Sequence, residues 1–243
     1  METRTVILHY HLFKNAGTSL DQILKQNFPG RWVTREFPKK SGDNSALVAD
    51  WIGSNPEAVA FSTHTARGPI PAILGTRIIS VMFFRDPLER ILSAYRFERR
   101  QEAETFGARL AKETDLKGYV QDRLARSGDR QCRNFQTESL AGLVPGDGPE
   151  LERAKRGLQM LSLAGLVEDF EGSVQRLAQI LRPHFPDFAA TFQHKNISDP
   201  GLGNDHEERA YLKQSASHAN ADDFEILAAA RQLLNAQSGQ SPP

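Results

Sequence analysis

Residues 6–24 read VILHYHLFKNAGTSLDQIL, and the spacing of their apolar side chains changes partway along. The run begins with Val6, Ile7 and Leu8, a short apolar segment typical of a buried strand. Apolar residues at positions 20, 23, 24 and 28 then recur every three or four residues, as they do on one face of a helix. We therefore predict a strand, a turn of small residues and a helix.

The predicted turn has the composition of an anion-binding loop. The first N–H groups of a helix lack partners within the helix, and the helix dipole concentrates positive charge there. Gly17 permits close approach of the backbone, Lys14 adds a cation, and Thr18 and Ser19 add hydroxyl groups at the helix start. On this stretch alone, an ordinary capped helix with a solvated lysine is the alternative interpretation.

The loop differs from the usual nucleoside-triphosphate loop. That motif, G-x-x-x-x-G-K-[ST], places its lysine directly after a glycine, whereas Lys14 precedes Gly17 by three residues. A standard kinase or GTPase is therefore disfavoured.

Length and composition set broader limits. The 243 residues are long enough for one α/β domain, which we predict over residues 1–236, followed by a disordered tail over 237–243. Thirty basic and 30 acidic residues give zero net charge, which argues against a nucleic-acid partner. No run approaches the length of a membrane span, and a lone Cys132 fits a reducing compartment, so we expect a cytoplasmic protein without an integral membrane segment. Burial as a structural thiol is the expectation for Cys132.

Residues 58–64 read as a second buried strand that ends at His64. Ligands of open α/β sheets gather at the carboxyl ends of strands, and a histidine there can accept a proton near neutral pH. A purely structural histidine is the alternative interpretation.

Residues 77–84 form a third predicted strand, almost continuously apolar, and a strong helix signal follows it. Asp86 is the expected N-cap, Pro87 fits the first helical position, and Glu89 completes a capping box. Arg85 before this helix and Ser93 two turns into it could grip one phosphate, although a surface arginine and a neutral serine would look the same.

Three motifs resemble those of the sulfotransferases that use 3′-phosphoadenosine 5′-phosphosulfate. Residues 11–20, HLFKNAGTSL, resemble the family's H-x-P-K-T-(A/G)-G-T-S-L loop, with Phe13 and Asn15 in place of Pro and Thr. Residues 84–95, FRDPLERILSAY, resemble its R-D-P-x-x-R-x-x-S-x-Y segment. Residues 134–142, NFQTESLAG, are similar to N-x-Q-T-R-x-L-x-G, with Glu138 replacing the arginine. The resemblance implies an α/β fold in which a mostly parallel central sheet is flanked by helices, as in P-loop-like sulfotransferases.

The resemblance also implies roles for particular residues. The donor, a small molecule, would be bound by the loop and by the second motif, that is by Lys14, Asn15, Ala16, Gly17, Thr18, Ser19, Arg85 and Ser93. Lys14 and His64 would be catalytic, His64 as the base. A carbohydrate or glycolipid would be the acceptor, with His11, Asn134 and Gln136 as candidate contacts. No metal is expected.

The rest of the chain supplies further expected elements. Ser45 is the expected N-cap of a helix that Gly53 closes, and a polar segment over 192–204 resembles a late loop of the family. A charged stretch over 96–131 is expected to expose its arginines to solvent or to an acidic or glycan acceptor. Further helices are predicted over 116–124, 150–161, 170–181 and 222–234, and a strand over 164–167.

Two other functions remain open at this point. A small-molecule kinase would share the fold and the loop but would need Mg²⁺ and an acidic residue to hold it, and Asp86 is already used as a cap. A catalytically silent nucleotide-binding protein would keep the loop without the reaction.

Overall fold

The computed structural model describes residues 3–38, 42–191 and 205–238, and its described strands form one sheet. The strand order is β2-β3-β1-β4-β5, and every pair of neighbouring strands is parallel. The bounds of the strands are β1 Arg4–Tyr10, β2 Trp32–Thr34, β3 Ala60–Thr63, β4 Thr76–Phe84 and β5 Leu163–Leu166. The predicted α/β class with a parallel central sheet is confirmed.

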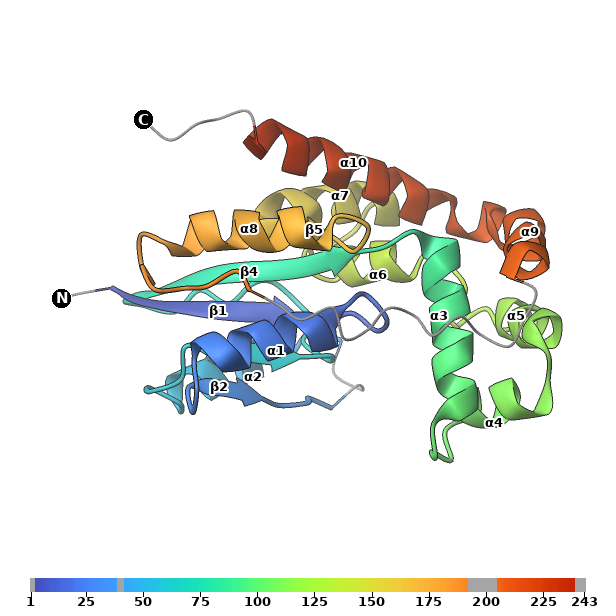
Figure 1. Cartoon of the computed structure of the whole chain (residues 1–243), viewed down its shortest axis with the longest axis horizontal. Helices are drawn as coiled ribbons and strands as arrows, with labels where there is room; N and C mark the ends of the chain where they lie inside the picture. The colour runs from blue at the N-terminus through green and yellow to red at the C-terminus, as the bar shows by residue number, and fades with distance from the viewer. Residues whose placement is uncertain (1–2, 39–41, 192–204, 239–243) are drawn as a thin grey trace.

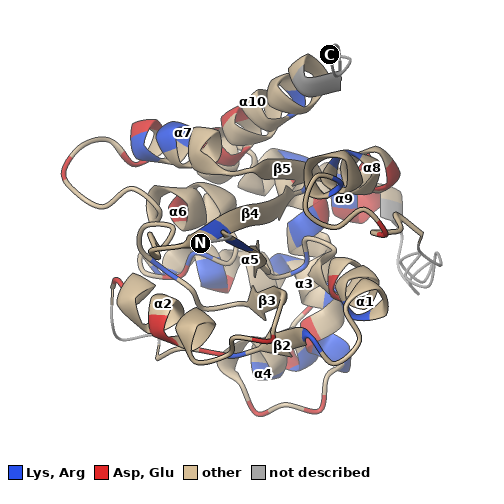
Figure 2. Ribbon diagram, turned by 90° about the vertical axis from the view of Figure 1, so that its left-hand side faces the viewer, with Lys and Arg blue, Asp and Glu red and all other residues tan. Residues whose placement is uncertain are grey.

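Helices cover both faces of the sheet (Figure 2), with α1 and α8 on one side and α2 and α6 on the other. At the carboxyl ends of the strands, α3, α4, α5 and α9 gather in a separate group (Figure 1). The bounds of the helices are α1 Gly17–Asn27, α2 Ser45–Gly53, α3 Pro87–Arg100, α4 Phe106–Glu113, α5 Leu116–Ala125, α6 Phe135–Ala141, α7 Glu150–Met160, α8 Phe170–Leu181, α9 Asp205–Ala216 and α10 Ala221–Ser238.

The central strands lie between these helix layers and are buried on both faces. Val6, Ile7 and Leu8 of β1 have no exposed surface, and the last six residues of β4 are buried as well. Removing this much apolar surface from water is the main stabilising contribution to such a fold. The strand order places the loop after β1 between the ends of β3 and β4.

A second apolar cluster joins α3 to α4, α5 and α9, and it includes Tyr95, Tyr119 and Cys132. Beside it, the buried Arg123 forms ion pairs of 2.8 Å with both Glu98 and Asp129. The expectation of a solvated charged face is wrong for Arg123, because its side chain is buried and these carboxylates compensate its charge.

Several predicted boundaries need correction. Ser45 is the first residue of α2, and Asn44 occupies the N-cap position. Asp86 does cap α3 by accepting hydrogen bonds from the N–H groups of the second and third helical residues, but the capping box does not form. The Asp86 N–H donates to Glu168 instead, and the Glu89 carboxylate accepts from Arg209 of α9. Local spacing could not predict these long-range partners.

At the C-terminal end, α10 continues to Ser238, two residues into the predicted tail. Helices α4 and α9 were not predicted, because α4 is only eight residues long and α9 has few apolar residues. The expected late loop over 192–204 and the rest of the tail, 239–243, lie outside the described residues. None of the helices in the described ranges is long and apolar enough to cross a lipid bilayer.

Candidate active site

The loop between β1 and α1 has an unusual backbone. Lys14 and Ala16 both have left-handed conformations, with φ of 66° and 57°. Residues other than glycine adopt this region at an energetic cost, and such residues concentrate at functional sites. Ala16 is the N-cap of α1 and offers no side-chain cap, so no N-cap side chain occupies the first N–H groups of the helix. Thr18 and Ser19 therefore do not cap the helix.

Gln136 joins this loop to the end of β4. Its Oε1 accepts from Asn15 Nδ2 at 2.7 Å and from the Arg85 N–H at 2.9 Å, while its Nε2 donates to the Arg85 carbonyl at 2.9 Å. Asn15 Nδ2 also donates to the Phe83 carbonyl at 2.7 Å. Residues from three separate sequence motifs are thus held in one buried hydrogen-bond network.

The same network brings two cations together. Arg85 Nη1 donates to the Lys14 carbonyl at 3.2 Å. Burial lowers the pKa of the Lys14 ammonium, and the positive charges of Arg85 and Arg100 lower it further. Burial also lowers the pKa of Arg85, against the opposing effect of nearby carboxylates. A bound anion would relieve the repulsion between these positive charges.

Helix α3, which carries Ser93, contacts the loop through Phe97. The Lys14 ammonium lies 4.4 Å from the centre of the Phe97 ring, and Phe13 packs edge-on against the same ring. Residues four apart in a helix share a face, so the half-buried Ser93 lies one turn before Phe97 on the side that Lys14 covers. The structure therefore brings Lys14 and Arg85 together at one end of the sheet and places Ser93 on the adjacent helix α3, one turn before the ring that Lys14 covers.

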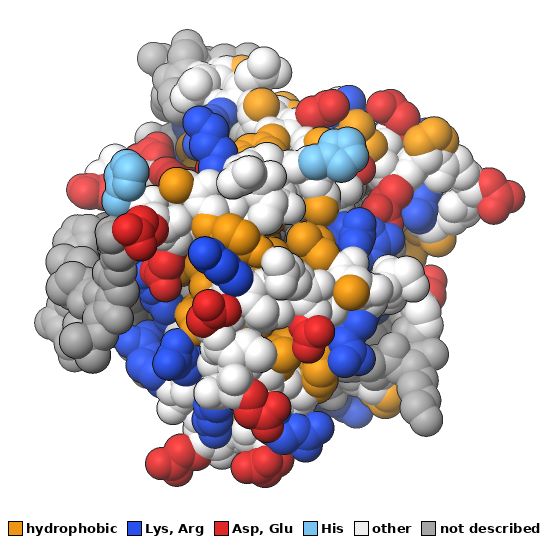
Figure 3. Space-filling model, turned by 90° about the vertical axis from the view of Figure 1, so that its right-hand side faces the viewer, with side chains coloured by type: hydrophobic (Ala, Val, Ile, Leu, Met, Phe, Trp, Pro, Cys, Tyr) orange, Lys and Arg blue, Asp and Glu red, His pale blue; other side chains and the backbone are white. Residues whose placement is uncertain are grey.

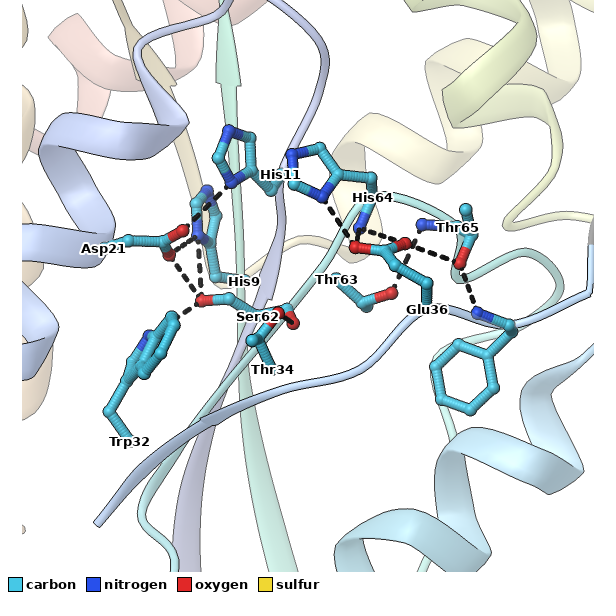
Figure 4. A network of polar contacts seen from close by, with 11 residues as sticks. His9, His11, Asp21, Trp32, Thr34, Glu36, Ser62, Thr63, His64 and Thr65 are labelled. Carbon is cyan, nitrogen blue, oxygen red and sulfur yellow. Dashed lines mark hydrogen bonds and ion pairs between the residues drawn. The ribbon is translucent and has the colours of Figure 1, made fainter. Parts of the chain in front are cut away.

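His64 follows β3 and is held by a carboxylate that the sequence did not suggest. Its Nδ1 lies 2.7 Å from Glu36 Oε1, and its backbone N–H donates to both Glu36 oxygens at 3.2 Å (Figure 4). Burial would raise the pKa of Glu36, but hydrogen bonds from His64 and Thr65 outweigh it and lower that pKa. With Nδ1 bound to a carboxylate and about half of the side chain exposed, His64 presents Nε2 to solvent.

His11 lies directly against His64, with ring centres 3.9 Å apart, and is held by a second carboxylate (Figure 4). Asp21 accepts from His11 Nδ1 at 3.0 Å, from His9 Nδ1 at 2.9 Å and from Ser62 Oγ at 2.5 Å. Burial would raise the pKa of Asp21, but these three hydrogen bonds outweigh it and hold that pKa far below its usual value. Asp21 is therefore an ionised carboxylate shared by two imidazoles.

The ligand atoms of His9, His11 and Asp21 all lie within 4.8 Å of one another, a grouping that could hold a metal ion. Hydrogen bonds to Asp21 account for the same arrangement, since each imidazole Nδ1 has a carboxylate oxygen within 3.0 Å.

The predicted acceptor contacts on and before α6 face inward. Gln136 is fully buried with both ends of its amide hydrogen bonded. Asn134 Nδ2 donates to Asp222 at 2.9 Å, and the Asn134 backbone N–H donates to Asn220 Oδ1 at 3.1 Å. These side chains connect α6 to β4 and α10, so in this structure their contacts are internal.

An open groove of about 570 Å³ runs from the loop after β3 to α4, α5 and α6. Phe106 and Phe135 contribute aromatic side chains, and Arg67 is paired with Glu138 at 3.6 Å. The guanidinium of Arg126 stacks on the Phe106 ring at 4.3 Å. Arg67, which lines one end of the groove, belongs to the same loop as His64 and comes three residues after it.

The exposed face around α3, α4, α5 and α9 carries both signs of charge. Figure 3 shows basic and acidic side chains interspersed there, with hydrophobic side chains between them. Arg209 of α9 pairs with Glu89 of α3 at 2.5 Å, and Arg96 pairs with Glu208 at 2.5 Å. This mixed surface agrees with the zero net charge of the whole chain.

Asp21 and Glu36 are the residues that sequence reasoning missed. Asp21 occupies a polar position of an amphipathic helix, and Glu36 lies in a short extended segment, so neither has a distinctive local signal. Only the order of the strands brings both carboxylates to the histidines of β1 and β3.

A parallel α/β sheet with a cationic strand–loop–helix junction at its carboxyl edge defines an anion-binding protein of the P-loop-like type. The chain matches the description "Sulfotransferase family" over residues 1–139, more than half of its length, and it belongs to this family. It is also 40% identical over 203 residues to an uncharacterized protein of Archaeoglobus fulgidus, and the match covers 80% of each chain. Sulfuryl transfer is thereby the general activity of the chain.

Proposed function

We propose that the chain transfers a sulfuryl group from 3′-phosphoadenosine 5′-phosphosulfate to a hydroxyl group of a carbohydrate or glycolipid. The observation that carries the choice of donor is the convergence of Lys14 and Arg85 at one site, where burial lowers the pKa of both side chains and the charge of Arg85 lowers that of Lys14 further. A ligand with phosphate groups at both ends would compensate these charges, with Arg85 and Ser93 serving the 3′-phosphate and the loop from Lys14 to Ser19 the 5′-phosphosulfate.

In the proposed reaction the acceptor oxygen attacks sulfur opposite the leaving phosphate oxygen. The new O–S bond forms as the S–O bond to the 5′-phosphate breaks, and adenosine 3′,5′-bisphosphate leaves. His64 Nε2 takes the hydroxyl proton, since Glu36 occupies Nδ1 and stabilises the imidazolium that results. Lys14 compensates the charge that develops on the leaving oxygen.

The groove lined by Arg67, Phe106 and Phe135 supports a carbohydrate acceptor. A volume of about 570 Å³ suits a ligand of one or a few sugar rings. Two phenylalanine rings provide flat apolar surface, and arginine and glutamate side chains provide hydrogen-bonding partners for hydroxyl groups. Phe135 also lies next to Gln136, so the groove adjoins the network that holds Arg85.

The kinase alternative finds less support. A kinase requires an acidic residue at the end of β4 that is free to hold Mg²⁺. Asp86 lies there, but its Oδ1 already accepts hydrogen bonds from the N–H groups of Leu88 and Glu89. Glu168 likewise already accepts a hydrogen bond, from the Asp86 N–H at 2.6 Å.

Calorimetric titration with adenosine 3′,5′-bisphosphate, beside ATP with Mg²⁺, tests the donor. We expect the bisphosphate to bind and Arg85→Ala to weaken it by about ten- to hundredfold, because a charge-assisted contact is lost. Arg77→Ala is the matched control, since Arg77 is exposed at the other end of the same strand. Tighter binding of Mg-ATP would favour the kinase instead.

Release of the bisphosphate in the presence of carbohydrate, glycolipid, phenol and tyrosyl-peptide acceptors tests the reaction. Lys14→Ala should lower turnover at saturating donor by about 10²- to 10³-fold. Lys25→Ala, at the far end of α1, should leave turnover unchanged. Full turnover by the Lys14 variant would refute its proposed role, and binding without turnover on any acceptor would favour a silent nucleotide-binding protein.

A further inference from the structure

His11 has a position that the proposed reaction does not yet use. A Cβ atom built on Gly17 would lie 2.0 Å from Cδ2 and 2.2 Å from Nε2 of His11, so this edge of the imidazole covers the first residue of α1. The first N–H groups of that helix are the ones expected to receive an anion. Nε2 of His11 therefore borders the place where an anionic group of the donor would lie.

The orientation of His11 is set from both sides. Asp21 Oδ2 binds its Nδ1 at 3.0 Å, which directs Nε2 away from Asp21. The ring lies between those of His9, 5.2 Å away, and His64, 3.9 Å away. Only about a tenth of the His11 side chain is exposed. A side chain locked in this way loses little conformational freedom when a ligand arrives.

Charge decides what such an imidazole can do. An anion next to a neutral Nε2 lone pair is repelled, whereas an Nε2–H group donates a hydrogen bond to it. Asp21 is an ionised carboxylate with the side chain only 14% exposed, and a positive imidazole between it and the anion would compensate both charges. Among the described residues, the other titratable side chains that contact His11 are His9 on β1 and His64, which is held by Glu36.

We propose that His11, oriented by Asp21, donates a hydrogen bond from Nε2 to the anionic group of the donor bound at the start of α1. This inference rests on the proposed function and adds a second histidine with a role distinct from that of His64. His64 accepts the acceptor's proton, whereas His11 keeps its own and binds the donor. Each histidine has its own carboxylate, since Asp21 binds the buried ring of His11 and Glu36 binds the exposed ring of His64.

Two substitutions of His11 separate donor binding from a structural role. His11→Gln retains an N–H group near the Nε2 position, and His11→Asn retains one near the Nδ1 position that faces Asp21. If His11 binds the donor, His11→Asn weakens adenosine 3′,5′-bisphosphate by about ten- to hundredfold, while His11→Gln stays within about threefold of the wild type. A purely structural contact to Asp21 predicts the opposite order. His218→Asn, at an exposed histidine, is the control.

The inference is overturned if the wild type binds the bisphosphate and His11→Asn binds it equally well. It is also overturned if the wild type binds it and both variants are weakened to the same extent. In either case the proposed donor stands, because the wild type binds it. If the wild type does not bind the bisphosphate, the donor and the role of His11 are both overturned. Thermal unfolding of each variant shows whether it is folded.

A measurement on the wild type avoids dependence on folded variants. In a ¹⁵N NMR titration with the bisphosphate, the His11 Nε2 resonance should move toward the value of a protonated nitrogen. An Nε2 resonance that stays at the value of an unprotonated nitrogen at saturation would overturn the inference.

Discussion

Replacing Gln136 with methionine removes three hydrogen bonds that connect the β1–α1 loop to the end of β4. Methionine has nearly the same volume as glutamine, so the packing around α6 is kept and the polar contacts are lost. Asn15 Nδ2 retains the Phe83 carbonyl at 2.7 Å, whereas the N–H and carbonyl groups of Arg85 lose their Gln136 partners.

The expected cost follows from these two backbone groups. Each buried polar group left without a partner costs about 1–3 kcal/mol, and Arg85 is only partly buried, so the total should be about 2–4 kcal/mol. With a urea m-value of about 2–3 kcal/mol/M, the unfolding midpoint should fall by about 1 M. Fluorescence of Trp32 and Trp51 reports the transition.

The same substitution should weaken binding of adenosine 3′,5′-bisphosphate, because Arg85 and Lys14 no longer share a fixed arrangement. Gln159→Met, at an exposed position of α7, should change the free energy of unfolding by no more than about 0.5 kcal/mol. If Gln136→Met unfolds at the wild-type urea concentration, the view that Gln136 holds the two motifs together is refuted.

Three other substitutions or reagents probe the surroundings of the site. Gly17→Ala should destabilise the protein by about 1–3 kcal/mol in thermal unfolding, because the added methyl group overlaps the ring of His11. Gly53→Ala is the control, since its methyl group would enter open space, and equal melting temperatures of the two variants would contradict the prediction. Burial raises the pKa of the Cys132 thiol to about 12, so a thiol reagent at pH 8 should react only after denaturation, and rapid labelling of the native protein would disprove it. Glu98→Gln breaks a buried ion pair and should cost about 3–5 kcal/mol in urea unfolding, with a loss below 1 kcal/mol counting against the pair.

Local patterns in the sequence determined the strand–loop–helix unit at the start of the chain and the capped helix after β4. Both depend on contacts within a few residues, such as the apolar run of β1 and the Asp86 cap of α3, so the sequence alone was sufficient. The motifs also indicated the sulfotransferase family, which the match over residues 1–139 confirms. The predicted capping box was wrong because of a distant partner, since the Glu89 carboxylate binds Arg209 instead of closing the box.

Only the tertiary structure decided which side chains meet. The parallel order β2-β3-β1-β4-β5 brings β3 beside β1, which places His64 against His11 although the two are 53 positions apart in the chain. It likewise brings Glu36 to His64 and Gln136 to Arg85. A buried polar group needs a partner wherever the fold supplies one, and no local pattern in the sequence records where that partner will be.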